Sequence, residues 1–289
     1  MESGPSRRAA FLHSDQLEQY NYPADCPFNS RRAGEVKRIL ASHGLLSGPD
    51  RGQVEPASAT RDEITVVHTG EYLDALQAAQ EGSLAVEGLQ MGLGTGDCPV
   101  FEGMYDYAAL ACGATLTGVK LILAGETDVA FNPSGGYHHA FRSRAAGFCY
   151  INDSAIACWH LAAGGKRVLY IDVDAHHGDG VQDAFYSSND VMTISFHESG
   201  RTLFPGTGFP DEIGQGEGTG YCINMPLPPG IYDEAYLAAF EQIALPLIGS
   251  FDPDVIVLEL GMDGLSSDPL THMSLTNNAY VSVIEHVLA

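Results

Sequence analysis

The sequence has little positive charge. Its 289 residues hold 14 lysines and arginines against 37 aspartates and glutamates, which gives a formal net charge of −23 at pH 7. A protein of that charge offers no basic surface for nucleic acid or an anionic membrane. No run of about 18 uninterrupted apolar residues is present, so we expect no transmembrane helix. The opening "MESGPSRRAAFLHSDQ" also lacks the apolar run of a signal peptide, and we expect a soluble cytoplasmic protein.

Closely spaced cysteine pairs are also absent. The six cysteines are scattered along the chain, and none forms a CxxC pair. This distribution favours reduced thiols over a disulfide framework or a thiolate zinc site. The length allows one large α/β domain or two smaller ones.

The second half of the sequence alternates between strand and helix patterns. Nearly continuous apolar runs at 167–174, 191–197 and 254–261 predict buried strands. Helical patterns at 180–188 and 232–251 separate them. Elsewhere we expect a short strand at 128–132 and helices at 28–46, 70–82, 104–125, 152–165 and 276–289. The alternation predicts a mainly parallel sheet covered by helices on both faces.

Polar residues follow the carboxyl ends of four of these strands, where open parallel sheets place their sites. The strand at 128–132 leads to His138 and His139, and the strand at 191–197 leads to His197. The strand at 254–261 leads to Asp263. The strand at 167–174 leads to the largest group, which is Asp172, Asp174, His176 and Asp179. Buried charge without a partner costs several kcal/mol, so such a cluster predicts a bound metal ion.

Three of these residues make a plausible ligand set for zinc. Asp174, His176 and Asp263 offer two carboxylates and one imidazole, and a catalytic zinc site of three protein ligands keeps one position open. Residues two apart in an extended chain point the same way, so we expect Asp174 and His176 to reach one ion together.

The remaining polar residues suit the chemistry of such a site. A divalent metal polarises a carbonyl group and lowers the pKa of its bound water. The adjacent His138 and His139 would supply the general base, and Asp172 and Asp179 are left to orient those imidazoles.

Each of these residues also has an ordinary interpretation. A single histidine or aspartate at a strand end is most often structural, and adjacent histidines can simply face solvent. We assign a structural role to the other histidines, His13, His43, His68, His160, His272 and His286. The motifs DxDxHHGDG, GGYHH and GMDGLSSDPL at three separate strand ends together favour a functional site.

Long motifs over almost the whole chain resemble the zinc-dependent histone deacetylase family, and especially its bacterial acetoin-utilisation branch. They include "GLGTGDCPVFEGMYDYA", "AFNPSGGYHHAFRSRAAGFCYINDSAIA", "YIDVDAHHGDGVQDAFY", "TISFHESGRTLFPGTG" and "LELGMDGLSSDPLTHMSLTNN". The resemblance implies the arginase/deacetylase α/β fold, with residues 1–289 in a single catalytic domain around a central, mainly parallel sheet.

The resemblance also implies a role for each site residue. It makes Asp174, His176 and Asp263 the ligands of one zinc ion. It makes His138 and His139 the tandem catalytic histidines, with His139 as general base and acid. Asp172 would pair with His138, and Asp179 with His139.

Other roles follow from the same resemblance. The acyl-lysine channel and its rim would use Asp97, Gly147, Phe148, Phe204 and Leu270. One K⁺ or Na⁺ site would use Asp172, Asp174, His176, Ser195 and Phe196. A second would use Phe185, Ser188, Val191 and Tyr221.

Two features depart from the family pattern. Glu259 and Met262 stand where the family more often has glutamine and alanine. The family also supplies a tyrosine after a glycine-rich loop well beyond the last metal aspartate, whereas this sequence stops at Ala289. We therefore expect the C-terminal part of the fold to be missing, which would leave an uncovered edge prone to self-association.

The expected function is zinc-dependent hydrolysis of acetyl-lysine side chains in proteins or peptides. Acetylated polyamines or other small acetylated amines are alternative substrates. A ureohydrolase-like enzyme with two metal ions is disfavoured, because it would need more bridging carboxylates. A weakly active or non-catalytic acyl-lysine-binding protein stays open, because the tyrosine is absent.

Overall fold

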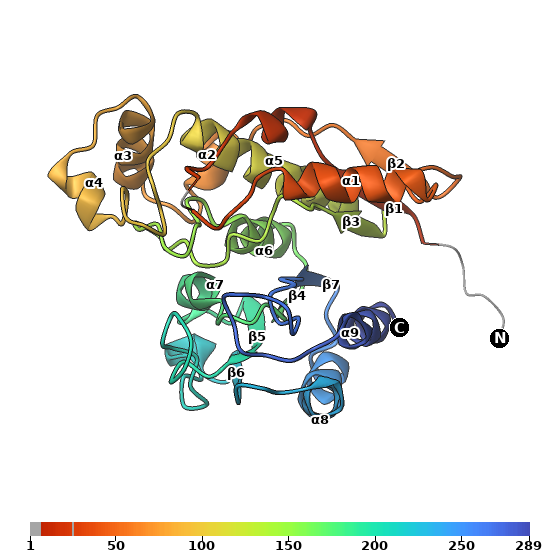
Figure 1. The fold of residues 1–289 in the computed structure, drawn as a ribbon. Coiled ribbons are helices and arrows are strands. Elements are labelled where there is room, and N and C mark those ends of the chain that lie inside the picture. Colours follow the sequence, from red (N-terminus) through yellow and green to blue (C-terminus); the bar gives the residue numbers. More distant parts are fainter. Residues whose placement is uncertain (1–6, 25) are drawn as a thin grey trace. The chain divides into compact units, whose positions relative to one another are not determined.

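The computed structural model describes residues 7–24 and 26–289. The chain divides into two compact units, Met1–His160 and Leu161–Ala289. Both combine a parallel sheet with helices, so the predicted α/β class is confirmed. The two units are described in turn (Figure 1).

The first unit contains a three-stranded parallel sheet in the order β2-β1-β3. Its strands are β1 (Ala9–Leu12), β2 (Arg51–Val54) and β3 (Val129–Phe131). The central strand pairs on both sides, with Phe11 in register with Gln53 and Phe131. The helical segments are η1 (Asp15–Gln19), α1 (Arg32–Ser42), α2 (Arg61–Ile64), α3 (Gly70–Gln80), α4 (Val86–Gln90), α5 (Met104–Leu123) and α6 (Asp153–Ala163).

Helix α5 is the main core helix of this unit. It is the one helix of the described residues long and apolar enough to cross a membrane, yet most of its residues are buried within the unit. It packs closely on the sheet at Gly118, where an added Cβ would lie 2.8 Å from Ala130 and 2.9 Å from Leu12. The sequence predicted this buried helix at 104–125.

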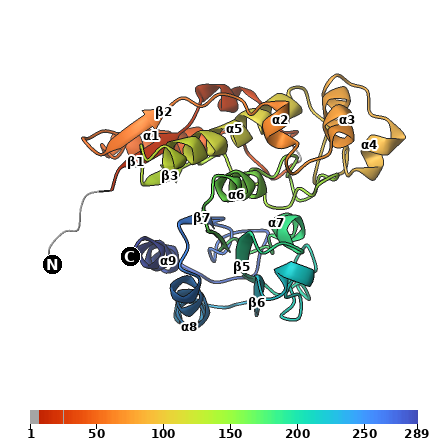
Figure 2. The ribbon, with the colours of Figure 1, turned by 180° about the vertical axis from the view of Figure 1, so that it is seen from behind.

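The second unit contains a four-stranded parallel sheet in the order β6-β5-β4-β7. Its strands are β4 (Val168–Asp172), β5 (Val191–Glu198), β6 (Cys222–Leu227) and β7 (Val255–Glu259). The helical segments are α7 (Asp179–Phe185), η2 (Gly216–Gly218), α8 (Asp233–Phe251) and α9 (Asn277–Leu288). Helices α8 and α9 lie side by side, as seen from both directions (Figure 2).

The core of the second unit lies between its sheet and these two helices. Phe196 of β5 and Phe240 of α8 are fully buried, with ring centroids 5.2 Å apart. Tyr280 and Val283 of α9 belong to the same apolar cluster. Strands β4 and β5 are buried along their whole length, in agreement with their largely apolar sequences.

The strand predicted at 128–132 corresponds to β3, but β3 pairs with β1 and not with the strands of the second unit. Within the described residues, the expected central sheet therefore consists of two parallel sheets. The sequence interpretation missed β1, β2 and β6. The prediction of one domain over residues 1–289 stays a prediction.

Candidate active site

Three side chains of the second unit form a candidate metal site. Each of Asp174, His176 and Asp263 offers one ligand atom, and these atoms all lie within 4.8 Å of one another. Nδ1 of His176 lies 3.0 Å from an Asp174 oxygen and 2.7 Å from an Asp263 oxygen. Each side chain is less than a fifth exposed. One imidazole and two carboxylates are a donor set that zinc accepts, with a position left for water or substrate.

The chain brings these ligands together through a tight bend. Strand β4 ends at Asp172, so Asp174 and His176 do not continue the extended segment predicted over 167–174. The backbone N–H of His176 donates to Asp174 Oδ1 at 2.7 Å, and the N–H of Asp174 donates to Asp172 Oδ1 at 3.1 Å. Such carboxylate-to-backbone bonds favour a turn over a strand. The proximity of the two side chains was predicted, but from the wrong geometry.

The third ligand is attached to the same bend. Asp263 follows β7, and its Oδ1 accepts the backbone N–H of Ala175 at 2.9 Å. Gly261 of the same segment lies against Asp174, because a Cβ there would overlap the Asp174 carboxylate. The sequence interpretation missed this role of Gly261. Its signal was a glycine at a strand end, two residues before a predicted ligand.

The electrostatics of the three residues suit a cation. Burial lowers the pKa of His176, but hydrogen bonds and charge from Asp174 and Asp263 outweigh it and raise that pKa to about 10. Burial and the neighbouring Asp174 charge raise the pKa of Asp263 to about 6. The two carboxylates therefore hold a proton on the imidazole, and a metal ion would take the place of that positive charge.

Asp172 lies fully buried beside this site. Its Oδ2 accepts the Tyr170 hydroxyl at 2.7 Å, and Gly178 packs so closely that a Cβ there would overlap the carboxylate. In the sheet, Asp172 is in register with Ser195 of β5 and Glu259 of β7. Asp172 and Ser195 both belong to the first predicted K⁺ or Na⁺ site, which stays a prediction.

The second predicted monovalent site falls around the end of α7 and the start of β5. The carbonyl of Phe185 accepts the N–H of Ser188, and the carbonyl of Tyr221 accepts the N–H of Thr193. Val191 is the first residue of β5 and is buried. That site also stays a prediction.

The tandem histidines belong to the first unit. His138 and His139 are 3% and 5% exposed, and their Nε2 atoms lie 3.0 Å apart. One ring must donate and the other accept, so the two tautomers depend on each other. Asp179, the first residue of α7, is buried in the second unit. The pairings of Asp172 with His138 and of Asp179 with His139 join different units and stay predictions.

The predicted channel residues of the first unit include a strained backbone. Gly147 and Phe148 have φ values of 52° and 68°, and Phe148 is one of only two non-glycine residues with positive φ in the described residues. A non-glycine residue in this region costs roughly 1–2 kcal/mol, and such strain tends to occur at functional sites. The Tyr22 hydroxyl donates to the Phe148 carbonyl at 3.1 Å and helps to hold it. Asp97 lies exposed in a loop.

The predicted channel residues of the second unit are solvent-accessible. Phe204 is 44% exposed, and its ring lies 6.2 Å from the His176 ring, edge to face. Leu270 is 45% exposed. Phe204 therefore lies near His176 at the surface, and the channel roles of Phe204 and Leu270 stay predictions.

Two buried histidines hold the loop that follows Phe204. His177 Nδ1 bonds the Thr207 hydroxyl at 2.9 Å, and His197 Nε2 donates to the Gly208 carbonyl at 2.9 Å. His197, which the sequence placed among the strand-end residues, therefore supports a loop through this bond. His177 was missed, although it stands in the HHGDG motif. Burial lowers the pKa of His177, so its ring stays neutral.

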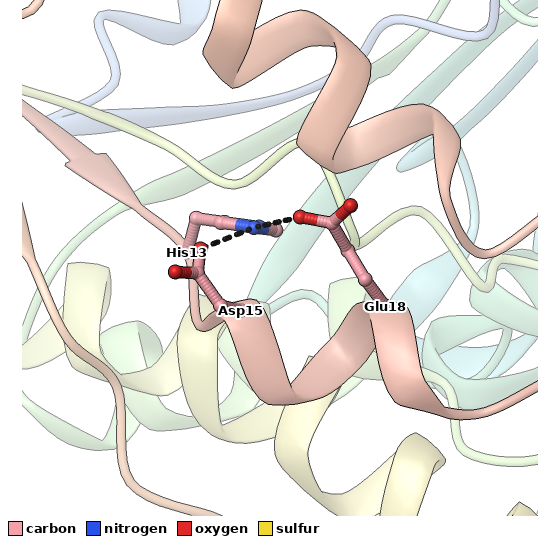
Figure 3. A group of neighbouring side chains, drawn as sticks. All are labelled: His13, Asp15 and Glu18. Atoms are coloured by element: carbon pink, nitrogen blue, oxygen red, sulfur yellow. Dashed lines mark ion pairs between the residues drawn. The ribbon is translucent and has the colours of Figure 1, made fainter.

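A second group of potential metal ligands lies in the first unit (Figure 3). His13 Nε2 lies 3.6 Å from Asp15 and 3.5 Å from Glu18. Both carboxylates already have cationic partners from α1, because Lys37 lies 2.5 Å from Asp15 and Arg38 lies 3.1 Å from Glu18. Burial and the Lys37 charge lower the pKa of His13. This group is an ion-pair cluster, in agreement with the structural role assigned to His13.

The parallel α/β units and the Asp/His/Asp site match a known class of hydrolase. Residues 26–289 match the family described as "Histone deacetylase domain". The chain belongs to the histone deacetylase family. Its sequence is 43% identical to the acetoin utilization protein AcuC of Bacillus subtilis (strain 168), over 98% of this chain and 74% of that protein. It is 41% identical to histone deacetylase 8 of Xenopus tropicalis, over 89% of this chain and 70% of that protein.

Solved structures agree with this membership. The crystal structure of a histone deacetylase homologue from Aquifex aeolicus matches 97% of this chain and 76% of its own, with a TM-score of 0.88 and 36% identity. The chain spans a smaller share of other relatives, for example 59% of human histone deacetylase 1.

Proposed function

We propose that this protein is a zinc-dependent amidohydrolase that removes acetyl groups from lysine side chains of cytoplasmic proteins or peptides. The observation that carries the proposal is the grouping of Asp174, His176 and Asp263, a donor set that a catalytic zinc ion accepts. The buried tandem histidines supply a general base in the same chain. Relatives named histone deacetylase support the reaction class.

The residues of the chain would divide the chemistry as follows. When bound, zinc would polarise the acetyl carbonyl and acidify a water molecule. Asp174, His176 and Asp263 would hold the ion, with His176 neutral. His139 would take a proton from the water and return it to the leaving lysine amine. His138, whose Nε2 lies 3.0 Å away, would fix the tautomer of His139.

The proposed substrate is a linear acyl-lysine. Phe148 and Phe204 would form the aromatic walls of the channel, with Gly147 at its base. Leu270 would line the rim, and Asp97 would hold the substrate backbone. A homologue with a TM-score of 0.87 was solved in a complex with SAHA, which supports a ligand-binding function for this fold.

Turnover of a fluorogenic acetyl-lysine peptide by the zinc-loaded 289-residue chain tests the proposal. His139→Ala should lower kcat by about 10²–10⁴-fold, which is the usual contribution of a general base, and leave the zinc content unchanged. His43→Ala, at an exposed histidine that ends α1, is the matched control and should leave kcat unchanged. Loss of zinc in step with activity would show that His139 is a ligand or a structural residue.

The same assay separates the alternative functions. An acetylated polyamine should give a much lower kcat/KM than the peptide, and the reverse order would favour the small-amine alternative. Tight peptide binding without turnover would indicate an acyl-lysine-binding protein.

A further inference from the structure

One side chain bonds the main chain on both sides of His139. Asn152 is fully buried, and its Nδ2 donates to the carbonyls of His138 at 3.1 Å and Ala140 at 2.9 Å. Its Oδ1 accepts the N–H of Ala155 at 2.8 Å, which caps the first turn of α6. Both donor hydrogens and the acceptor of the carboxamide are therefore used, and they tie the tandem histidines to the start of a helix.

The residues around Asn152 extend this attachment. The N–H of Asn152 donates to His68 Nε2 at 2.9 Å. The next residue, Asp153, accepts the N–H groups of Gly136 at 3.1 Å and Tyr137 at 2.8 Å. Asn152 and Asp153 thus bond four of the five consecutive residues from 136 to 140. The segment that carries the histidines is a loop, so its main-chain groups have no paired strand to bond. These side-chain bonds take the place of the main-chain hydrogen bonds that a paired strand would provide.

We propose that Asn152 is a positioning residue, which sets the placement of the His138 and His139 rings by fixing the carbonyls on either side of His139. The proposal rests on the proposed function, because placement affects turnover only if these rings move protons. Nε2 atoms 3.0 Å apart require both rings to be held at once. A displacement of about 1 Å in a catalytic group can cost on the order of 10²-fold in rate.

Asn152→Asp is the sharpest test in the full 289-residue chain loaded with zinc. The carboxylate can still accept the Ala155 N–H, but it cannot donate to the two carbonyls and would repel them. We expect kcat on an acetyl-lysine peptide to fall about 10²-fold, with the zinc content unchanged. Asn152→Ser is the second variant. Its hydroxyl also caps α6 but is too short to reach both carbonyls, so it should show the same loss if Asn152→Asp fails to fold.

Asn224→Asp is the matched control. Asn224 is a buried residue of β6 whose Nδ2 donates to the Glu212 carbonyl at 3.1 Å and to Gln182 at 2.7 Å. The same substitution there removes the same kind of bonds and should lower the unfolding temperature with little change in kcat. If Asn152→Asp or Asn152→Ser keeps kcat within twofold of the unchanged chain, the proposal is wrong.

A second measurement does not depend on activity. The ¹⁵N shifts of the His138 and His139 rings report their tautomers, and both Asn152 variants should change them while Asn224→Asp should not. If the unchanged chain shows no turnover, but the Asn152 variants still change the ¹⁵N shifts, the positioning role is supported and the proposed function is contradicted. Unchanged shifts would overturn the positioning role, whether or not the chain turns over.

Discussion

At the scale of single residues, main-chain N–H groups bond the carboxylates of the candidate metal site, in addition to the His176 side chain. The N–H groups of His176 and Ala175 donate to Asp174 and Asp263, respectively. Hydrogen bonds of this kind orient ligating carboxylates before a metal ion binds. The shape of the site therefore depends on residues that never touch the metal.

Gly261 gives a direct test of that dependence. Gly261→Ala would place a methyl group where the Asp174 carboxylate lies, so we expect zinc affinity to fall at least about tenfold, measured by competition with a chelator. Gly249→Ala in α8 is the control, because a Cβ there has no atom within 4 Å. Equal zinc affinity in both variants would contradict the account of Gly261.

His68 predicts how stability depends on pH. Burial lowers the pKa of His68 to about 4, below the ordinary 6.5, so the unfolded chain takes up a proton that the folded chain does not. Above pH 6.5 this difference does not lower the free energy of unfolding. As the pH falls from 6.5 toward 4, the free energy of unfolding decreases, in total by about 3 kcal/mol.

Urea unfolding of the unchanged chain and of His68→Gln measures this effect. Glutamine can still accept the Asn152 N–H, but it does not titrate. The loss of unfolding free energy between pH 6.5 and 4 should be smaller in the variant. Parallel curves for the two proteins over that range would contradict the assignment.

At the scale of elements, the apolar packing of α8 supports the sheet whose strand ends lead to the candidate metal site. Phe240 is fully buried against Phe196. Phe240→Ala should lower the free energy of unfolding by about 3–5 kcal/mol, the usual cost of such a cavity. Val281→Ala in α9, at a residue 49% exposed, should change it by no more than about 0.5 kcal/mol. Similar losses in both variants would show that α8 does not pack as described.

The sequence predicted the long elements and the grouping of the three candidate metal ligands because both have local signals. Strand β5 and helix α8 agree with their predicted ranges to within one residue. Strand β1 was missed because four residues show no clear period, although it is central in its sheet. Strand β6 contains Pro226, which argues against a strand.

The unpredicted parts of the site depend on contacts between residues far apart in the sequence. Asn152 acts on a carbonyl 14 residues earlier. His177 bonds a threonine 30 residues later. Gly261 matters because of Asp174, which comes from another strand end. The residues beside Gly261 and His177 mark both positions as noteworthy, but they do not identify the distant partner, so only the fold reveals these contacts.

At the scale of the whole molecule, the resemblance predicts one catalytic domain over residues 1–289, while the fold divides into two compact units. A single domain should unfold in one calorimetric transition, with equal calorimetric and van't Hoff enthalpies. Phe240→Ala should then lower the temperature of that transition as a whole. Two transitions, with only one sensitive to Phe240→Ala, would show that the units are separate domains.

The central claim is that a metal held by Asp174, His176 and Asp263 drives hydrolysis of acetyl-lysine. Its most direct test is a zinc titration of the metal-free chain, with turnover of an acetyl-lysine peptide as the readout. We expect turnover to rise until about one zinc per chain is bound. Asp263→Asn, which keeps the shape of the side chain and removes its charge, should bind zinc weakly and stay inactive at the same zinc concentration. Turnover that does not depend on zinc, or an Asp263→Asn chain that binds zinc and turns over like the unchanged one, would contradict the claim.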